Sequence, residues 1–344
     1  MAYTDIDKPS DYFNTKLYTG TGSSQSITGV GFQPDWVWIK NRSGTDWHIL
    51  TDAVRGATKE LYSNATNLED TNSNQLTSFN SDGFSIGGAS ETGRNSANFA
   101  SWNWKAGTSF TNDASGTGIG SIDSAGSFNN DSGFSIVSYT GTGSAGTIKH
   151  GLNSVPSMII IKVLTNTAND WCVYHQATGN NKSTFLNGTN AVSSNAFMNN
   201  TTPTSSVFSV DGSNYSSGSS RNYIAYCFSD VKGYSKFGSY TGNNNSNGKF
   251  IYLGFKPAFF ICKNYQDAGD NWILHDNKRD TFNVTDNGLA PNSNTAEFTD
   301  VDMDFLSNGV KMRNVTGRAN SAKTFIYMAF SEESFVSSTG VPAT

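Results

Sequence analysis

The sequence predicts an all-β protein of three tandem antiparallel β-sandwich repeats, of the jelly-roll or lectin-like kind, behind a short N-terminal arm. One motif carries most of this prediction. FQPDWVWIK at Phe32–Lys40 returns as SVPSMIIIK at Ser154–Lys162 and as FKPAFFICK at Phe255–Lys263, each with a lysine six residues after its proline. Recurrence at intervals of roughly one hundred residues, the size of a common β-sandwich, indicates one domain repeated three times.

The composition favours strands joined by polar loops. Charged residues make up 15% of the chain, aromatic residues 13%, and there are 34 glycines, whereas disordered chains are highly charged and poor in aromatic residues. Alternating segments bounded by glycine turns are frequent, and no long segment has a helical period. The net charge of −5 and the lack of a basic run argue against a nucleic-acid partner, which needs a positively charged patch.

The chain divides into an arm, three repeats, a linker and a tail. Residues 1–13 (MAYTDIDKPSDYF) are mostly turn and cap formers, so they form an arm that is either disordered or bound to a partner. The three β-sandwich repeats span 14–107, 134–232 and 233–334. Residues 108–133 are rich in Gly, Ser and Asn and are expected as a linker with at most one short strand, and 335–344 as a small polar tail.

The recurring motif is expected as the central strand of each repeat, because both of its faces are largely apolar. In the first copy Trp36 and Trp38 point to one side and Val37 and Ile39 to the other. Other strands are expected at 16–18, 46–50, 84–86 and 99–105, at 134–139, 170–174, 208–210 and 223–228, and at 271–274, 310–312 and 325–330. Residues 53–61 have the composition for one helical turn, although Gly56 weakens it.

Metal, redox and membrane chemistry find little support in the sequence. The cysteines Cys172, Cys227 and Cys262 lie far apart in hydrophobic runs, so we expect buried free thiols, as in a reducing cytosol. The four histidines form no zinc pattern, and no cofactor is expected. The N-terminal segment has no signal-peptide core, and no apolar run reaches the roughly 18 residues of a membrane span. These features predict a soluble protein without membrane insertion.

A tryptophan follows the motif in each repeat, as Trp47, Trp171 and Trp272. The residue before it is Asp46, Asp170 or Asn271, respectively. As core residues, the tryptophans would recur because the core itself recurs. As sugar platforms, they would offer a flat apolar face beside a polar side chain that bonds hydroxyl groups. The core is the ordinary interpretation, and the six residues are candidates for glycan binding. Trp36 and Trp38 are interpreted as core or as a subunit interface.

Another candidate glycan contact lies in a loop of the second repeat. Tyr215 and Asn214 precede the polar run at 216–220. Tyr, Asn, Ser and Gly are the adaptable contact residues of binding loops. A solvated turn has the same composition, so the loop is a candidate only.

Two kinds of acidic cluster were considered for chemistry. Asp300, Asp302 and Asp304 alternate along FTDVDMDF, so they would face one side of a strand and could hold calcium, or they could discourage pairing of an exposed edge. A glycosidase needs two carboxylates in a cleft. The pairs available are Asp52 with Glu60 and Glu69 with Asp70, and both are expected to be solvated loop carboxylates.

Long stretches of the sequence resemble a repeat family found in virion proteins of tailed, mostly marine phages, tail-fibre-like proteins among them. The resemblance lies in FQPDWVWIKNRSG, ILTDAVRGATKEL, TSFNSDGFSIGG and ASWNWKAG, and in GFSIVSYTGTGSAGTIKHGLNSVPSMIIIK of the second repeat. It extends over residues 1–334 and implies a lectin-like or laminin-G-like sandwich located on the virion. It carries over no catalytic residues. Repeat three departs from the pattern, since its closing strand lacks the tryptophan pair, and it is expected to have a separate role.

Two functions from different classes follow from these observations. The first is a structural or adhesion protein of the virion, such as a tail fibre, tail appendage or capsid-surface component, which either binds a host surface glycan or only builds the particle. It would contact other virion proteins through its N-terminal arm and form a homo-oligomer, a trimer by preference, after assembly in the host cytoplasm. The alternative is a virion-associated enzyme that degrades polysaccharides and carries these sandwiches as binding parts. A cytosolic lectin is a third interpretation.

Overall fold

The computed structural model describes residues 4–315 and 317–340. Within these residues the protein is all-β, and the named strand pairs are antiparallel. The strands form three units, defined here as unit 1 (residues 13–104), unit 2 (108–228) and unit 3 (235–334). None of the helices in the described residues is long and apolar enough to cross a membrane. The expected all-β class is confirmed.

Unit 1 contains β1 (Phe13–Thr19), β2 (Gln25–Thr28), β3 (Trp36–Asn41), β4 (Ile49–Asp52), β5 (Lys59–Tyr62), β6 (Asp70–Thr71), β7 (Leu76–Asn80), β8 (Gly83–Ile86), α1 (Ser90–Gly93) and β9 (Asn98–Trp104). Unit 2 contains β10 (Thr108–Asn112), α2 (Ala114–Thr117), β11 (Ser124–Asn129), β12 (Phe134–Thr140), β13 (Gly146–Lys149), β14 (Met158–Val163), β15 (Cys172–His175), β16 (Thr184–Phe185), β17 (Val207–Val210) and β18 (Asn222–Phe228). Unit 3 contains β19 (Ser235–Thr241), β20 (Phe250–Tyr252), β21 (Phe255–Asn264), β22 (Ile273–Asp276), β23 (Met303–Leu306), β24 (Gly309–Met312), α3 (Gly317–Asn320) and β25 (Thr324–Ser334). The 3₁₀ helix η1 (Pro9–Asp11) precedes unit 1.

The larger sheet of each unit contains four strands in the same order. The order is β1-β9-β3-β4 in unit 1, β12-β18-β14-β15 in unit 2 and β19-β25-β21-β22 in unit 3. The motif strands β3, β14 and β21 hold equivalent positions, since each lies between the strand that ends its unit and the strand that follows it in the chain. Every residue of β3 and of β14 is buried, so the prediction that this strand is covered on both faces is confirmed.

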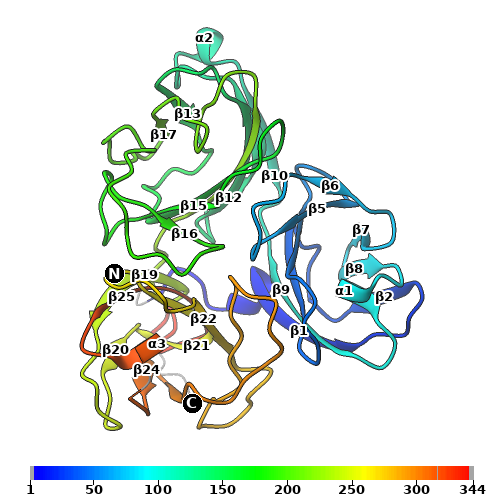
Figure 1. Ribbon diagram of the computed structural model, residues 1–344, viewed down its shortest axis with the longest axis vertical. Coiled ribbons are helices and arrows are strands. Elements are labelled where there is room, and N and C mark those ends of the chain that lie inside the picture. Colours follow the sequence, from blue (N-terminus) through cyan, green and yellow to red (C-terminus); the bar gives the residue numbers. More distant parts are fainter. Residues whose placement is uncertain (1–3, 316, 341–344) are drawn as a thin grey trace.

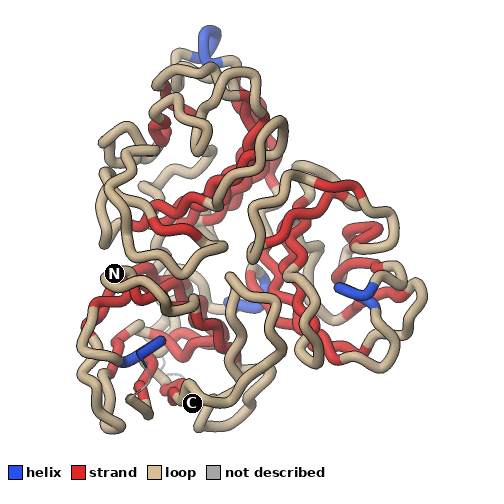
Figure 2. The backbone as a smooth tube through the Cα atoms, viewed as in Figure 1, coloured by secondary structure: helices blue, strands red, loops and turns tan. Residues whose placement is uncertain are grey.

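Each unit also has a smaller sheet, and the larger sheets of the three units meet at the centre of the molecule (Figures 1 and 2). The smaller sheets are β2-β8-β7, β13-β17 and β20-β24-β23. Each unit has its own hydrophobic cluster between its sheets, and a further cluster joins side chains of all three units. One face of each central strand therefore serves the core of its own unit, and the other face serves the shared centre. The three cysteines are free and buried, as predicted.

Some local expectations were wrong in position or kind. The expected linker at 108–133 contains β10, α2 and β11, and both strands extend the larger sheet of unit 2. The strand expected at 46–50 begins only at Ile49. Residues 53–61 form turns that lead into β5 rather than a helical turn. The polar composition of these segments hid short strands, because such strands need only a few buried side chains on one face.

The N-terminal arm belongs to the fold rather than standing free for a partner. Ile6 is 4% exposed, and Thr4 is buried with its hydroxyl near the Ser334 hydroxyl, at 3.0 Å. The Asp5 N–H donates to the Lys232 carbonyl at 3.1 Å, and Asp7 accepts from the Ser338 N–H at 2.7 Å. The described part of the arm thus binds unit 3 of its own chain. Residues 1–3 of the arm and 341–344 of the tail lie outside the described residues.

We expect Ile6→Ala to lower the free energy of unfolding by about 2–4 kcal/mol, because it opens a cavity where the arm enters the shared core. Chemical denaturation of the full chain measures this. Val155→Ala, at a side chain that is 48% exposed, should change stability by less than about 0.5 kcal/mol. Equal stability of the two variants would mean that the arm is only loosely attached.

Candidate functional site

The shared centre of the molecule is built from large aromatic side chains on the outward faces of the central strands. Trp36 stacks on Tyr226 of unit 2 with ring centroids 4.4 Å apart, and Trp104 packs edge-on against Phe259 of unit 3 at 5.7 Å. Phe228 and Phe330 close the third side at 6.1 Å. Trp36 and Trp38 are fully buried here, so they pack between units of one chain, and the core interpretation holds for them.

A first ring of hydrogen bonds joins each unit to the one before it. His48, Trp171 and Trp272 each stand directly before the strand that pairs with the motif strand. Trp171 Nε1 donates to the Tyr62 carbonyl of unit 1 at 2.9 Å, and Trp272 Nε1 donates to the Phe185 carbonyl of unit 2 at 3.0 Å. His48 Nε2 is 3.1 Å from the Ala290 carbonyl of unit 3. Equivalent positions in all three units therefore make the same contact to the preceding unit.

A second ring runs in the opposite direction, from the last residue of the same strands. Asp52 accepts from the Tyr226 hydroxyl of unit 2 at 2.7 Å, and Asp276 accepts from Trp102 Nε1 of unit 1 at 3.0 Å. His175 Nε2 is 3.1 Å from the Tyr327 carbonyl of unit 3. Each unit is thus bonded to both of its neighbours, and the polar atoms of these two rings are satisfied by the adjacent unit.

The motif lysines lie in the same interface region. Lys40 Nζ donates to the Asn294 carbonyl of unit 3 at 3.0 Å, and Lys162 Nζ donates to the Thr66 carbonyl of unit 1 at 2.7 Å. Lys263 Nζ donates within its own unit, to the Asn264 carbonyl. Burial lowers the pKa of all three ammonium groups to about 8, although aspartates nearby partly counteract it. The recurring lysine is therefore a buried donor to loop carbonyls rather than a surface charge.

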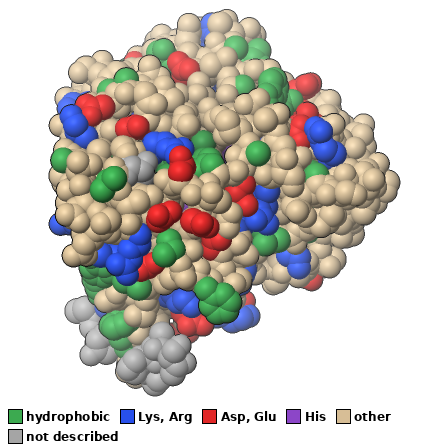
Figure 3. Space-filling model, turned by 60° about the horizontal axis from the view of Figure 1, so that its bottom comes forward, with side chains coloured by type: hydrophobic (Ala, Val, Ile, Leu, Met, Phe, Trp, Pro, Cys, Tyr) green, Lys and Arg blue, Asp and Glu red, His purple; other side chains and the backbone are tan. Residues whose placement is uncertain are grey.

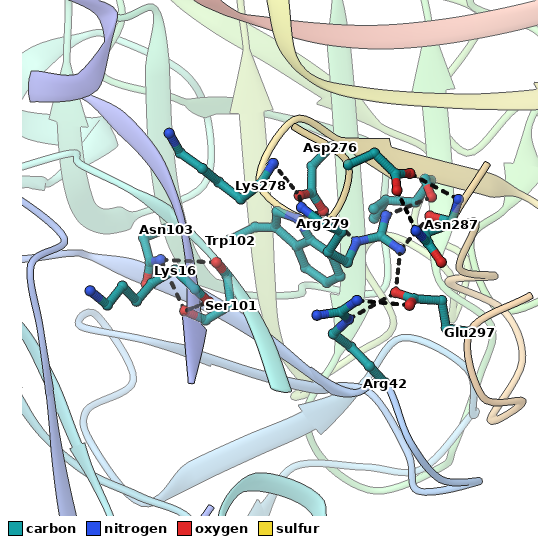
Figure 4. A network of polar contacts seen from close by, with 12 residues as sticks. Lys16, Arg42, Ser101, Trp102, Asn103, Asp276, Lys278, Arg279, Asn287 and Glu297 are labelled. Atoms are coloured by element: carbon teal, nitrogen blue, oxygen red, sulfur yellow. Dashed lines mark hydrogen bonds and ion pairs between the residues drawn. The ribbon is translucent and has the colours of Figure 1, made fainter. Parts of the chain in front are cut away.

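Figure 4 shows the ionic part of this interface, between units 1 and 3. Arg279 donates to Asp276 at 2.6 Å and to Glu297 at 3.0 Å, and Arg42 of unit 1 holds the same glutamate at 2.8 and 2.9 Å. Burial raises the pKa of Asp276, but the ion pair and hydrogen bonds with Arg279 outweigh it, so the pKa of this carboxyl ends below its usual value. The network fixes the interface and leaves little access for a substrate.

Unit 1 repeats the same arrangement with different partners. Arg55 donates to Asp52 at 2.5 Å and to Glu69 at 3.3 Å. The carboxylates considered as glycosidase pairs are thus engaged in the fold: Asp52 and Glu69 with Arg55, and Glu60 with the Tyr62 hydroxyl at 2.5 Å. Asp70 is exposed in β6. The expectation that these acids are all solvated was wrong, because Asp52 and Glu60 are buried.

The recurring tryptophans separate into two structural positions. Trp171 and Trp272 are buried at unit interfaces, so neither can offer a face to a sugar. Trp47 is 38% exposed and packs edge-on against Tyr62. The position equivalent to Trp171 and Trp272 in unit 1 is His48, because the loop before β4 is one residue shorter than its counterparts. Aligning the units by residue type therefore matched Trp47 with Trp171 and Trp272, although His48 is the structurally equivalent residue.

The polar residues named with the tryptophans make local contacts. Asp46 holds Arg94 and the Asn41 amide, each at 2.5 Å. Asp170 accepts from the Asn187 amide at 2.7 Å, and Asn271 accepts from the Asn292 amide at 2.8 Å. These side chains stabilise the loops ahead of the paired strands. They do not converge on a common site.

The loop candidates Tyr215 and Asn214 lie apart from the tryptophans, in unit 2. The Tyr215 ring is half-buried and stacks on Phe185 at 5.9 Å, and burial raises the pKa of its hydroxyl. Asn214 is exposed, and its carbonyl accepts from the Tyr223 hydroxyl at 3.0 Å. Both residues brace the end of unit 2, and only Asn214 is freely accessible.

The acidic run of unit 3 is used in ion pairs. Asp304 is buried and paired with Arg313, and Asp300 is paired with Arg318. Asp302 lies outside β23, so the three carboxylates do not share a strand face as expected. In the described part of the chain no three His, Cys, Asp or Glu side chains are grouped to hold a metal ion. The shared strand face on which the calcium hypothesis depended is therefore not formed.

Exposed aromatic residues gather on β20, the outer strand of the smaller sheet of unit 3. The sequence predicted no binding site at this strand. We call this the β20 surface and define it by Lys236, Lys249, Phe250 and Tyr252. Tyr252 is 56% exposed and Phe250 38% exposed. The equivalent residues of unit 1 are Thr28 and Ser26, and those of unit 2 are Lys149 and Thr147, by the pairing of β2, β13 and β20. In the sequence, Phe250 and Tyr252 are separated by one residue, so both rings lie on the same, outward face of a strand. This spacing was the sequence signal for an exposed aromatic surface.

Two depressions flank Tyr252. One has a volume of about 460 Å³ and adds Ser239 and Thr241 to the residues of the β20 surface. The other, of about 640 Å³, extends toward Asp230 and Gln176 of unit 2. Lys236 Nζ lies 5.1 Å from the centre of the Tyr252 ring and donates to the Tyr252 carbonyl at 2.8 Å. The ring is thus held in place beside a cation, with hydroxyl groups within the same depression.

A groove of about 1020 Å³ lies between units 1 and 2, beneath β10 and β11. Its walls include Arg55 and Glu69 from unit 1 and the aspartates Asp113 and Asp123 from unit 2. Asp113 accepts from the Gly116 N–H at 3.0 Å, and Asp123 accepts from the Ala114 N–H at 2.8 Å. Both carboxylates therefore hold the turn that contains α2.

The geometry places this chain among all-β proteins built from several open antiparallel sheets around a shared, hydrogen-bonded centre. The chain belongs to a family described as a domain of unknown function (DUF7483), which matches residues 8–334. The match includes all three units. The comparisons with curated proteins and with solved structures find no match.

We expect Arg279→Met to lower the free energy of unfolding by about 3–5 kcal/mol, because the fully buried Asp276 would lose its cationic partner, while Glu297 would keep only Arg42. Lys323→Met removes an exposed pair with Asp267 and should cost less than about 1 kcal/mol. Denaturant unfolding of both variants measures the difference. A cost for Arg279→Met as small as that of the control would show that the network contributes little.

His175 should make the fold sensitive to mild acid. Its Nδ1 accepts from the Ala177 N–H at 3.1 Å, so Nε2 carries the proton and the ring is neutral. Burial lowers its pKa from 6.5 to about 4. The unfolded chain binds this proton first as the pH falls, so the stability present above about pH 6.5 is lost on the way to pH 4.

We expect the stability advantage of the wild type over His175→Gln to shrink by about 2 kcal/mol between pH 7 and pH 5. Denaturation at several pH values measures it, with Val155→Ala as the control whose difference should stay constant. A constant difference for His175→Gln as well would mean that the ring titrates normally in the fold.

Proposed function

We propose that this protein is a structural and adhesion component of a tailed-phage virion and that it binds a host surface glycan through the β20 surface. The virion assignment is supported by the resemblance of residues 1–334 to virion repeat proteins. The adhesion role is supported by the placement of exposed aromatic and polar groups on unit 3. Nothing in the mechanism proposed here requires catalysis.

The proposal includes the origin of the three units as copies of one β-sandwich. The common strand order, the two rings of equivalent contacts and the position of the lysines support it. Duplication would explain why unrelated side chains, such as His48 and Trp171, make the same contact. The buried centre would then hold the three units in one fixed arrangement, as a structural component of a particle requires.

One observation carries the adhesion role, namely the aromatic pair at Phe250 and Tyr252. The same positions in units 1 and 2 carry Ser, Thr or Lys, so the pair is not required by the shared fold. Aromatic rings with one apolar face and polar neighbours suit ligands that are partly apolar and partly hydroxylated. Lys236, Lys249 and the hydroxyl groups of Ser239 and Thr241 supply the polar partners. A glycan of the cell surface combines both properties.

The arm leaves attachment to the particle to other surfaces, because Thr4 and Ile6 are buried against unit 3. We propose that the chain joins its virion partners as a folded trio, as a homo-oligomer in the particle. Detection of the chain in purified particles by mass spectrometry tests the virion assignment. Its absence from particles, when the chain is present in infected cells, would contradict it.

We expect Tyr252→Ala to weaken glycan binding about tenfold or more, the equivalent of about 1.4 kcal/mol, through loss of the exposed ring. Binding of the full chain to an array of bacterial surface polysaccharides measures this, together with Phe250→Ala. Thermal unfolding should remain close to wild type because both rings are exposed.

Trp47→Ala and Val155→Ala serve as comparison variants in the same assay. Loss of binding with Trp47→Ala alone would move the glycan site to unit 1. Unchanged binding in Tyr252→Ala and Phe250→Ala would contradict the role proposed for the β20 surface.

A further inference from the structure

Another depression of unit 3, separate from the two that flank Tyr252, contains a buried amide without a partner. This depression has a volume of about 280 Å³ and lies where β22 leads into the loop at 280–285. Asn277 is 8% exposed and lines it, and neither its amide nitrogen nor its amide oxygen has a hydrogen-bond partner among the described residues. A buried polar group without a partner destabilises a fold, so such groups need a specific explanation.

The other units show that the unpartnered amide is particular to unit 3. The backbone N–H of Asn277 donates to Ala258, just as the N–H of Gln176 donates to Ser157 and that of Ala53 to Asp35. These three residues are therefore equivalent. The Gln176 amide donates to Asp230 at 3.0 Å and to the Phe237 carbonyl at 2.6 Å, and Ala53 has no polar side chain. Among the three units, only unit 3 buries a side-chain amide at this position, and that amide makes no hydrogen bond among the described residues.

His275 adds to this cluster. It lies in β22, two residues before Asn277, which begins the turn after the strand, and it does not itself line the depression. Both of its ring nitrogens are buried and lack partners within the described residues. The equivalent residues are Thr51 and Tyr174, by the pairing of the motif strands. Two neighbouring polar side chains of unit 3 are thus unsatisfied at the end of one strand.

The mouth of the depression has an exposed aromatic ring and balanced charge. Phe282 is 84% exposed on the loop that forms one wall. Lys256 and Glu332 form an ion pair at 2.9 Å on the other side. Figure 3 shows acidic and basic side chains close together on the face that it draws, without a large area of one sign. The ligand that suits these walls is uncharged and hydroxylated, with one apolar face.

We infer that this depression, the Asn277 pocket, is a subsite for one pyranose residue of a glycan. The Asn277 amide offers both donors and an acceptor, which complement a pair of neighbouring ring hydroxyls. Phe282 lies where it can cover the apolar face of the sugar ring. The volume is at the lower end of ligand pockets and suits a single ring rather than a chain. This inference rests on the proposed glycan adhesion for its ligand, but it uses residues separate from the β20 surface.

The test uses the full chain and a panel of methyl glycosides of glucose, galactose, mannose and N-acetylglucosamine. Saturation-transfer NMR detects binding and titration gives the dissociation constant. Asn277→Ala and Phe282→Ala should each weaken the best glycoside about tenfold. Val315→Ala, an exposed apolar residue of unit 3 outside the pocket, should bind like the wild type.

Thermal unfolding separates binding from folding. Asn277→Ala removes a buried unsatisfied amide, so its melting temperature should equal or exceed that of the wild type while binding is lost. Glycoside binding that is unchanged in Asn277→Ala and Phe282→Ala would overturn the Asn277 pocket and leave the proposed adhesion in place. If the wild type bound neither the glycosides nor surface polysaccharides, both the pocket and the adhesion role would fall.

Discussion

Aromatic side chains on the outward faces of β3, β14 and β21 must be kept from water, and only the other two units can cover them. Trp36, Tyr226 and Phe330 would be exposed if any unit were isolated, since each belongs to the cluster shared by all three. Burying a side chain of this size contributes about 1.5–3 kcal/mol. The three units are therefore mutually dependent, and the match of one family to residues 8–334 agrees with this dependence.

The polar contacts at the centre give this apolar association its geometry. Hydrophobic burial alone has little directional preference, but the rings of hydrogen bonds admit one relative placement of the units. In the first ring, indole or imidazole nitrogens at equivalent positions contact a backbone carbonyl of the neighbouring unit. In the second ring, Asp52 and Asp276 accept from a phenol and an indole, whereas His175 at the equivalent position faces a carbonyl. Position at this interface is thus conserved within the chain more strictly than residue type.

Much of the strand content could be predicted, and much of the site could not. The motif strand was found because both of its faces are apolar and because it recurs with its lysine. The alternation of Trp36 with Val37 correctly indicated two buried faces, but a buried face does not say what covers it, so the shared centre remained hidden. Trp47 was matched with Trp171 because residue identity outweighed a one-residue difference in loop length. The β10–β11 pair was not predicted because polar residues can add strands to the edge of a sheet that other segments have formed. The packing of the arm was not predicted because its partners lie far away in the sequence.

The unpaired amide of Asn277 and the exposed rings of Phe250 and Tyr252 could be recognised only after the units had been aligned in space. Each is informative as a departure from two equivalent positions. In the sequence alone, an asparagine in a loop or an aromatic pair in a strand is ordinary. The third unit therefore differs from the others on its outer surface while keeping their common centre.

Because the arm packs on unit 3, it can reach its final position only after unit 3 has been synthesised. Thr4 and Ile6 are synthesised before Lys232 and Ser334, which hold them. Domains made early can fold during synthesis, but the arm remains unburied until unit 3 has been synthesised. Contacts this distant in sequence are slow to form. Docking of the arm therefore follows the synthesis of unit 3 and depends on it.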